Sequence, residues 1–435
     1  MLFRSVEQVL AAVGKQYSPK GATAIVINPR DGQILALANW PRINANDISS
    51  APEYATEDQA VGFSYEPGST FKAILAAAAI EERVVRPTDM FFCENGRYRI
   101  GRWTIHDSHP HAWLSFAEVI QYSSNIGATK VGDRLGADRY ARYLHAFGFG
   151  ARTGIELPGE SPGILRPVES WARIDLATHS FGQGVSVTAL QMAVAFGAIA
   201  NRGILMRPFL VRRVVDRSEH VTVENHPVAV RRVVSERTAA TVTTLLRRVV
   251  EEKGGTGERA RLDDFPVAGK TGTAQKVNQQ TGGYSSKRIG SFVGFVPADR
   301  PRIVVLVLID EPGTSSYGGV VAAPVFRGIA DVVLRRLGVE SEAPMVQPAA
   351  VRTVPAGTRV VPRTVSTRDL PATPSFLGLS RREALARARA SGWDVEVTGV
   401  GYVHEQVPPP GSPLARDRRL ALRLVPAASG ATTSQ

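Results

Sequence analysis

The sequence predicts an α+β fold, because strand-like segments near both ends of its first 340 residues enclose a long, mainly helical stretch. Residues 21–41 and 265–312 are rich in Val, Ile and Leu, and turn signals divide them. Neither group could pair all its strand edges alone, so pairing between them into one antiparallel five-stranded sheet implies one large domain. A change of composition at residue 340 predicts a separate small module after it.

The composition is that of an ordinary globular protein. The 435 residues are 43% hydrophobic and 21% charged, and the net charge of +12 is spread over scattered arginines. Because the basic residues form no dense block, nucleic acid is not expected as a partner. A single cysteine, Cys93, excludes an internal disulfide and a cysteine-based metal site. The longest clean apolar run, residues 73–80, is far shorter than the ~20 residues that span a bilayer.

The elements of the large domain follow in order from local patterns. The sequence predicts an amphipathic helix, a hairpin turned at "NPRDG", an apolar helix, a helical section with Gly/Pro-rich loops, a second apolar helix, three strands and a last amphipathic helix. The first helix is expected at residues 1–17, the hairpin at 21–41 and the first apolar helix at 69–81. The helical section extends to about residue 260 and includes the second apolar helix at 188–200. The three strands are expected within 265–277 and 287–312, and the last helix at 323–339.

Beyond this domain the sequence predicts a linker and a small α+β module. Residues 340–373 are rich in Pro, Val, Thr and Arg without periodicity, which is typical of an extended linker. Residues 374–426 contain a helix (380–392), a strand starting at "WDVEVTGV", a turn and a last strand. The tail, residues 427–435, is expected to be disordered. The predicted domains are therefore 1–339 and 374–426.

The stretch "YEPGSTFK" carries the first chemical motif. Pro67 and Gly68 shape a tight entry, so Ser69 is expected at the first turn of the apolar helix, where unpaired N–H groups favour a developing alkoxide. Lys72, three residues later, projects from the same face. Burial in the apolar helix lowers the pKa of a lysine, which allows a neutral amine to act as a general base. The alternative is a capping serine and a solvated lysine.

Two more motifs follow in the chain. "SSN" (Ser123 to Asn125) opens a predicted helix, where a second hydroxyl is able to relay a proton and an amide is able to hold a substrate carbonyl; an ordinary helix cap is the alternative. "KTGT" lies on a predicted strand, where Gly272 lets a ligand approach while Lys270, Thr271 and Thr273 meet a carboxylate. A solvated edge lysine beside a glycine bulge is the alternative there. Three histidines in "IHDSHPHAW" (His106, His109 and His111) are interpreted as a surface loop and not as a metal site.

The three motifs occur together, in this order, in serine β-lactamases and penicillin-binding proteins. Residues 1–339 resemble a class B penicillin-binding protein, the monofunctional D,D-transpeptidase that cross-links peptidoglycan. The resemblance rests on "GQILALANWP", "YEPGSTFK", "SSNIGATKVGDRLG", "SFGQGVSVTALQMA", "AGKTGTAQ" and "SFVGFVPADRP". It implies the penicillin-binding/serine β-lactamase-like transpeptidase fold, with an all-helical subdomain beside the sheet. Residues 374–426 resemble a PASTA domain, and the combination fits the septal cell-division type or its sporulation relative.

The resemblance implies a serine acyl-enzyme mechanism without a cofactor. Ser69 attacks the penultimate D-Ala carbonyl of a peptidoglycan stem pentapeptide and releases the terminal D-Ala. Lys72 is its base, and Ser123 passes the proton to the leaving amine. An amine of a neighbouring stem resolves the acyl-enzyme, and β-lactam antibiotics acylate the same serine.

The resemblance also implies binding roles for the remaining residues. Asn125 binds the substrate amide, and Lys270 with the hydroxyls of Thr271 and Thr273 surrounds the substrate carboxylate. The backbone N–H groups of Ser69 and Thr273 form the oxyanion hole. The partners implied are the stem peptide, β-lactams, a membrane glycosyltransferase and other cell-division proteins.

Three other functions share parts of this pattern. A D,D-carboxypeptidase differs only in using water to resolve the acyl-enzyme. A serine β-lactamase needs a glutamate to activate that water, and Glu156 and Glu160 in "ELPGESPG" lack supporting spacing. A penicillin-sensing or scaffold protein does not need every catalytic position to be filled, and here each one is.

The start of the sequence differs from the family pattern. Members carry a cytoplasmic tail, a transmembrane helix and a pedestal domain, none of which precedes residue 1 here. The substrate exists outside the cytoplasmic membrane, so the expected location is its extracytoplasmic face, with the membrane anchor missing from this chain. The interpretation is a fragment or a wrongly assigned start, which the upstream DNA tests.

Overall fold

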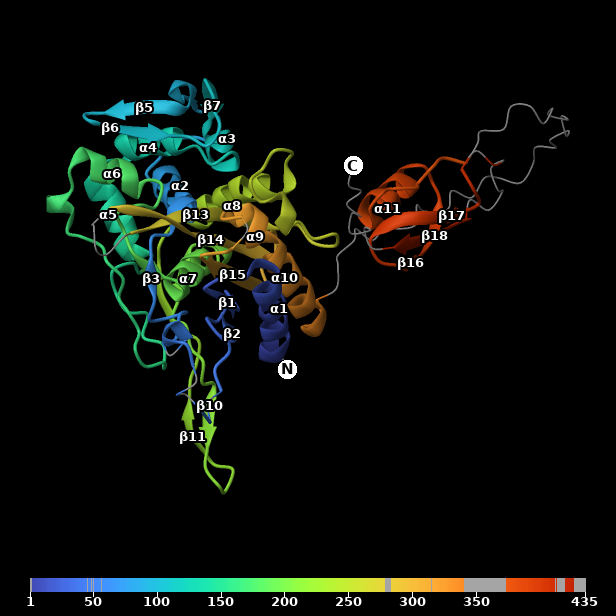
Figure 1. Cartoon of the computed structure of the whole chain (residues 1–435), viewed down its shortest axis with the longest axis horizontal. Coiled ribbons are helices and arrows are strands. Elements are labelled where there is room, and N and C mark those ends of the chain that lie inside the picture. The colour runs from blue at the N-terminus through green and yellow to red at the C-terminus, as the bar shows by residue number, and fades with distance from the viewer. Residues whose placement is uncertain are drawn as a thin grey trace, which may run out of the picture. The chain divides into compact units, whose positions relative to one another are not determined.

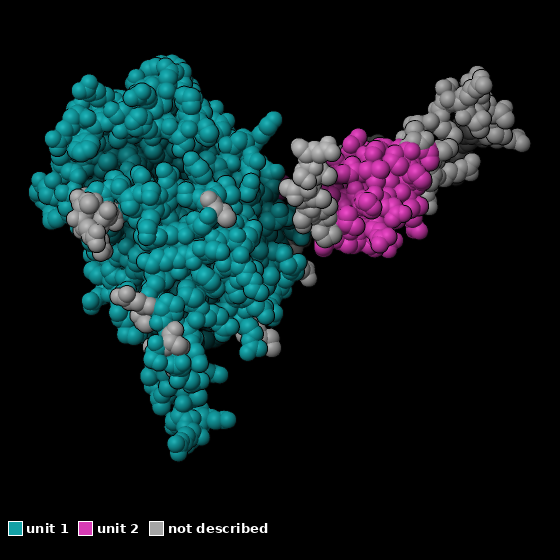
Figure 2. All heavy atoms as spheres, viewed as in Figure 1, with its two compact units in different colours: residues 1–340 teal, residues 341–435 magenta. Residues whose placement is uncertain are grey.

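A computed structural model describes residues 2–44, 46–47, 49, 51–55, 57–277, 283–313, 315–339, 373–410, 412 and 419–425. The chain divides into two compact units, residues 1–340 and 341–435 (Figure 2). The predicted linker, apart from Thr373, and the predicted tail lie outside the described residues. No helix among the described residues is both long and apolar enough to cross a membrane.

A five-stranded antiparallel sheet forms the centre of the larger unit, and its strand order is β13-β14-β15-β1-β2. The strands at the start of the chain therefore pair with those near residue 300, as predicted, through a β1–β15 ladder that runs from Gly21↔Asp310 to Ile27↔Val304. The bounds are β1 (Gly21–Ile27), β2 (Ile34–Trp40), β13 (Ala268–Val277), β14 (Tyr284–Val296) and β15 (Ile303–Asp310).

Helices cover both faces of this sheet (Figure 1). Every residue of β1 and β15 is buried, because alternate side chains enter two different cores. Val305 and Val307 pack with α1 (Leu2–Tyr17) and α10 (Ala323–Arg336), whereas Val304 and Leu306 pack with the apolar helix α7 (Ala189–Ala200). The central strands are therefore apolar along their whole length because helices cover both of their faces.

The section between β2 and β13 is rich in helices but is not helical throughout. Its helices are α2 (Lys72–Glu81), α3 (Phe116–Gln121), α4 (Asn125–Leu135), α5 (Ala137–Ala146), α6 (Arg173–His179), α7 and α8 (Glu236–Glu251). Short two-stranded ladders accompany them: β3 (Ser64–Tyr65) with β8 (Val187–Thr188), β4 (Met90–Phe92) with β7 (Trp113–Ser115), β5 (Arg97–Ile100) with β6 (Trp103–His106), and β9 (Ile204–Met206) with β12 (Ala229–Arg232). The hairpin of β10 (Arg213–Val215) and β11 (Val221–Glu224) projects from the body of the unit (Figure 1).

The smaller unit contains α11 (Arg381–Ala390) and a mixed sheet of β16 (Asp394–Gly399), β18 (Arg419–Val425) and β17 (Tyr402–Val407) in that order. β16 is parallel and β17 antiparallel to β18. The core contains Phe376, Ala384, Trp393 and Leu422. The sequence did not predict β17, because only Val403 and Gln406 of its residues are buried, so it has no clean alternation of apolar and polar residues.

Candidate active site

Ser69 lies on a 3-10 turn, η3 (Gly68–Phe71), which leads into α2. The α-helix itself begins at Lys72, three residues later than predicted, because the turn entering it is wound more tightly. Gly68 has a φ of +56°, and a Cβ atom there would lie 3.1 Å from the carbonyl oxygen of Thr273. The glycine therefore allows η3, called the serine turn below, to approach β13.

Lys72 is fully buried, as the apolar helix predicted, and its Nζ atom faces three polar residues. It donates to Ser69 Oγ at 3.1 Å, to Ser123 O at 2.6 Å and Ser123 Oγ at 3.1 Å, and to Asn125 Oδ1 at 2.8 Å. The structure thus brings the first and second motifs together around one amine.

Burial lowers the pKa of Lys72 to about 7, and the neighbouring Asp107 carboxylate and Cys93 partly oppose this effect. A buried ammonium loses its hydration, which favours the neutral amine. Near neutral pH a substantial fraction of Lys72 is therefore able to take a proton from the Ser69 hydroxyl, which lies within hydrogen-bond distance.

Ser123 occupies the bend between α3 and α4 with a φ of +63°, which is uncommon for a residue with a side chain. The next residue, Ser124, caps α4 by accepting a hydrogen bond from Gly127 N at 2.9 Å. The prediction that this motif opens a helix is confirmed. The left-handed bend turns both the carbonyl and the hydroxyl of Ser123 toward Lys72.

The third motif meets the other two at the same hydroxyl. Lys270 on β13 is fully buried and donates to Ser123 Oγ at 3.0 Å, which excludes the solvated edge lysine. Burial and the nearby Lys72 charge hold the pKa of Lys270 well below its usual range. Thr271 Oγ1 donates to Thr256 Oγ1 at 2.8 Å, and Thr273 Oγ1 accepts from Gly318 N at 3.1 Å.

Gly272 provides room for the packing of the protein itself, and its approach by a ligand stays a prediction. A Cβ atom at this position would lie 2.3 Å from Ser291 Oγ, 2.9 Å from Thr70 Cγ2 and 3.0 Å from Pro67 O. These atoms belong to β14 and to the segment that carries Ser69. The glycine therefore allows the serine turn to pack directly on β13.

A cavity of about 480 Å³ opens at these residues. Of the predicted site residues, Ser69, Ser123, Asn125, Thr271 and Thr273 line it, whereas the two lysines lie behind them. Its volume is within the usual range for ligand sites. The arrangement offers a nucleophile, a buried base, a shared hydroxyl and several donors on one cavity wall.

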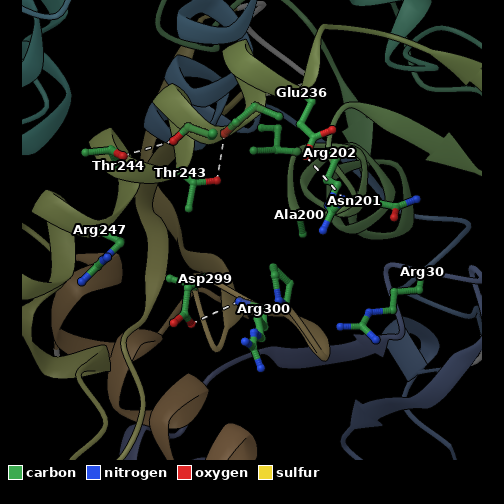
Figure 3. Close-up of a pocket in the computed structure, with 15 residues that line it drawn as sticks. Arg30, Ala200, Asn201, Arg202, Glu236, Thr243, Thr244, Arg247, Asp299 and Arg300 are labelled. Atoms are coloured by element: carbon green, nitrogen blue, oxygen red, sulfur yellow. Dashed lines mark hydrogen bonds and ion pairs between the residues drawn. The ribbon is translucent and has the colours of Figure 1, made fainter. Parts of the chain in front are cut away.

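A larger cavity of about 780 Å³ lies elsewhere in the unit (Figure 3). Arg247 of α8 lines it together with Arg30, Arg202 and Arg300, which lie in three separate turns. The hydroxyls of its two threonines, Thr243 and Thr244, donate to carbonyl groups of their own helix at 2.8 and 3.1 Å. It lacks a paired nucleophile and base, so the smaller cavity is the candidate active site.

Sequence reasoning missed two residues of the site. Asp107 lies in the histidine-containing run that was interpreted as a surface loop, yet its carboxylate binds the start of α4. Thr256, from "GGTG", lines the cavity beside Thr271. A glycine-flanked threonine was the only local signal for Thr256, and no local signal links Asp107 to α4.

Of the three histidines in "IHDSHPHAW", His109 lines the cavity. The described residues contain no group of three His, Cys, Asp or Glu side chains suited to a metal.

Comparison with known proteins shows which family the chain is similar to. Residues 22–331 match the family model of the penicillin binding protein transpeptidase domain, and residues 372–425 match the PASTA domain. The chain is 39% identical to stage V sporulation protein D of Bacillus subtilis and 33% identical to penicillin-binding protein PbpB of Mycolicibacterium smegmatis, over 77% and 76% of its length. It spans about half the length of these two relatives, 52% of each.

Solved structures are similar over the same region. Penicillin binding protein 3 of Mycobacterium tuberculosis, complexed with aztreonam, is 34% identical with a TM-score of 0.73, and the match covers 79% of both chains. The transpeptidase domain of Burkholderia pseudomallei penicillin-binding protein 3 is 33% identical with a TM-score of 0.69, and the match covers 79% of this chain and 96% of the other.

Proposed function

The chain belongs to the class B penicillin-binding protein transpeptidase family, with a PASTA domain, and on this basis we propose that it is a peptidoglycan D,D-transpeptidase. The observation that carries the proposal is the convergence of three distant motifs on one hydroxyl. Lys72 and Lys270 both reach Ser123 Oγ, and Lys72 also reaches Ser69 Oγ.

Acylation begins with attack of Ser69 Oγ on the carbonyl carbon of the penultimate D-Ala. Lys72 accepts the hydroxyl proton as the new C–O bond forms, and the carbonyl oxygen becomes an oxyanion. The proposed donors to this oxyanion are the backbone N–H groups of Ser69 and Thr273, each worth about 3–4 kcal/mol in comparable sites. The close approach of Gly68 to Thr273 supports this pairing.

Collapse of the tetrahedral intermediate breaks the C–N bond and releases D-Ala. The leaving amine takes a proton from Ser123, which regains one from Lys72; the hydrogen bond between these two residues supports this relay. The amine of a second stem peptide then attacks the ester carbonyl, with Lys72 again as base; the ester C–O bond breaks as the new peptide bond is completed, and Ser69 Oγ takes the proton back from Lys72. One peptide bond is formed for each one broken, so the reaction needs no cofactor.

The substrate is bound on both sides of the nucleophile. Asn125 accepts from Lys72 through Oδ1 and donates to the carbonyl oxygen of His106, so its orientation is fixed before a substrate amide arrives. Lys270, Thr271 and Thr273 provide the donors for the substrate carboxylate. β-Lactams carry an amide and a carboxylate in a similar arrangement and are proposed to acylate Ser69.

The cellular setting is proposed from the family. The catalytic domain (residues 1–339) acts at the extracytoplasmic face of the membrane in septal wall synthesis. A membrane glycosyltransferase, which supplies uncross-linked strands, and other cell-division proteins are its proposed partners. The PASTA domain is assigned to residues 374–426.

Labelling with a fluorescent penicillin tests the nucleophile. We expect covalent label on the wild-type chain and on Ser286→Ala, which changes an exposed serine of β14, but none on Ser69→Ala. An unlabelled wild type would contradict every acyl-enzyme function, and persistent label on Ser69→Ala would contradict this nucleophile.

A second assay separates the transpeptidase from related enzymes. A donor stem peptide ending in D-Ala-D-Ala is incubated with an acceptor amine, and the products are identified by mass spectrometry. We expect a donor–acceptor peptide bond and free D-Ala. Release of D-Ala without joined product indicates a carboxypeptidase, and rapid turnover of penicillin indicates a β-lactamase.

A further inference from the structure

Asp107 joins two segments of the active site that are separate in sequence. It follows β6 and is half-buried, and its carboxylate accepts from Ser124 Oγ at 2.5 Å, Asn125 N at 2.5 Å and Ile126 N at 3.0 Å. These donors belong to the first turn of α4 and to its cap. A carboxylate at the N-terminus of a helix satisfies unpaired N–H groups and is attracted by the positive end of the helix dipole.

The turn that Asp107 binds carries the residues that contact Lys72. Ser123 directly precedes Ser124, and its left-handed backbone conformation is maintained only if the surrounding structure holds it. Asn125 receives a second contact from the same segment, because its Nδ2 donates to His106 O at 2.9 Å. Asp107 therefore holds the backbone of this turn, while His106 orients the amide of Asn125.

Asp107 also places a negative charge that acts on the buried Lys72. The ionisable groups that act on Lys72 are Asp107, the thiol of Cys93 and, across Ser123, Lys270 on β13. Of these only Asp107 is a carboxylate. It opposes the effect of burial and raises the pKa of Lys72, which retains enough basicity to accept the Ser69 proton.

We propose that Asp107 is a positioning residue for acylation, which holds the Ser123 hydroxyl and the Asn125 amide against Lys72 and places a negative charge behind this buried amine. The inference rests on the proposed transpeptidase function, since it concerns the same serine, lysine and hydroxyl. Asp107 thus makes two separable contributions: it fixes the position of the turn, and it places a negative charge near the base.

Two variants of the full chain separate these contributions. Asp107→Asn keeps the size of the side chain and most of its hydrogen bonds but removes the charge. Ser124→Ala is the matched control, because it removes the hydrogen bonds of the Ser124 hydroxyl to Asp107 and to Gly127 N from the same turn and leaves the charge in place. Asp107→Glu keeps the charge but displaces it by one methylene group.

The readout is the second-order rate constant for labelling by a fluorescent penicillin between pH 5 and pH 9. Loss of the negative charge lowers the pKa of Lys72, so we expect the acidic limb of the Asp107→Asn profile to move down by about one pH unit. A weaker base also lowers the plateau, by about ten-fold. We expect Ser124→Ala and Asp107→Glu to react more slowly with the acidic limb at its wild-type position.

Equal profiles for wild type and Asp107→Asn would overturn the inference, as would identical shifts in Asp107→Asn and Ser124→Ala. If Asp107→Asn does not fold, the other two variants provide the test. The inference would be overturned if Asp107→Glu and Ser124→Ala both labelled at the wild-type rate, with the acidic limb of the pH profile at its wild-type position. Failure of the wild type to label at any pH would refute the proposed function itself, which distinguishes the two outcomes.

Discussion

Lys72 and Lys270 share one hydrogen-bond partner, since their Nζ atoms lie 3.1 and 3.0 Å from Ser123 Oγ. Both side chains are fully buried, so two full positive charges here would repel each other without solvent to screen them. The pair therefore titrates as one coupled unit, in which protonation of one lysine disfavours protonation of the other. The charge of a protonated Lys72 lowers the pKa of Lys270, whereas burial favours the neutral form of Lys72 that the attack by Ser69 requires.

The pH dependence of acylation follows from this arrangement. The pKa of Lys72 is lowered to about 7 by burial, and only its neutral amine accepts the Ser69 proton. As the pH falls below 7 the amine becomes protonated, so we expect the labelling rate to fall about ten-fold per pH unit. Stopped-flow or gel-based labelling with a fluorescent penicillin between pH 5 and pH 9 measures this limb.

A variant without the amine serves as the control for this limb. We expect Lys72→Ala to label at least about 10²-fold more slowly at pH 8, with no acidic limb near pH 7. Lys15→Ala, which changes an exposed lysine of α1, keeps the wild-type profile. An acidic limb that persists in Lys72→Ala would assign the titration to another group.

The backbone of Gly182 packs closely against Gly68 in the serine turn. Its carbonyl oxygen accepts from Gly68 N at 2.9 Å, and a Cβ atom would lie 2.1 Å from Gly68 O at a φ of +82°. We expect Gly182→Ala to slow acylation by ten-fold or more and to destabilise the unit by about 2 kcal/mol or more, because two backbone segments collide. Labelling kinetics and thermal melting measure the two effects.

Gly159→Ala is the matched control for backbone strain alone. Gly159 has a similar φ of +75°, but no atom lies within 4 Å of its would-be Cβ atom. We expect a loss of about 1 kcal/mol and a wild-type labelling rate. Equal effects of the two variants would attribute the Gly182 result to strain and not to contact with the serine turn.

Thr256 is expected to act through the hydroxyl of Thr271. Replacing it by valine keeps the volume but removes the acceptor for Thr271 Oγ1, which leaves a mostly buried donor without this partner. Such a loss costs about 1–3 kcal/mol, so we expect Thr256→Val to label about ten-fold more slowly. Thr256→Ser retains the hydroxyl and is expected to react at nearly the wild-type rate.

A penicillin methyl ester tests whether the Thr256 effect concerns the carboxylate. The ester lacks the anionic group that Thr271 and Lys270 are proposed to bind, so the difference between wild type and Thr256→Val should nearly vanish. A ten-fold difference that remains with the ester would indicate a general disturbance of the site.

His179 makes stability depend on pH in a different range. Its ring is buried against Trp171, and burial lowers its pKa from 6.5 to about 4. Between these two pKa values the unfolded chain binds the proton and the folded chain does not. The contribution of His179 to the free energy of unfolding is therefore fully present above pH 6.5 and is lost as the pH falls towards 4. The loss amounts to at most about 3 kcal/mol.

Thermal melting between pH 4 and pH 7 measures this loss. We expect His179→Phe to reduce the fall in melting temperature, since the phenyl ring keeps the packing but cannot titrate. His220→Gln, on the exposed hairpin, leaves the fall unchanged. A wild-type pH dependence in His179→Phe would contradict the assignment.

The sequence by itself determined the order of the elements, the pairing of the early and late strands into one sheet, and the three motifs. These features depend on local signals: apolar runs, turn residues and short spacings such as that between Ser69 and Lys72. The burial of Lys72 was also predictable, because α2 is apolar on every side.

Only the tertiary structure decided what surrounds those motifs. Asp107 bonds across 18 residues to Asn125, Thr256 across 15 to Thr271, and the space beside Gly272 is filled by Ser291 and the serine turn. A hydrogen bond or a close backbone approach between distant residues depends on where the folded chain places them, and it leaves no periodicity in the sequence. The reactive groups were therefore visible in the sequence, whereas the contacts that orient and charge them arise only on folding.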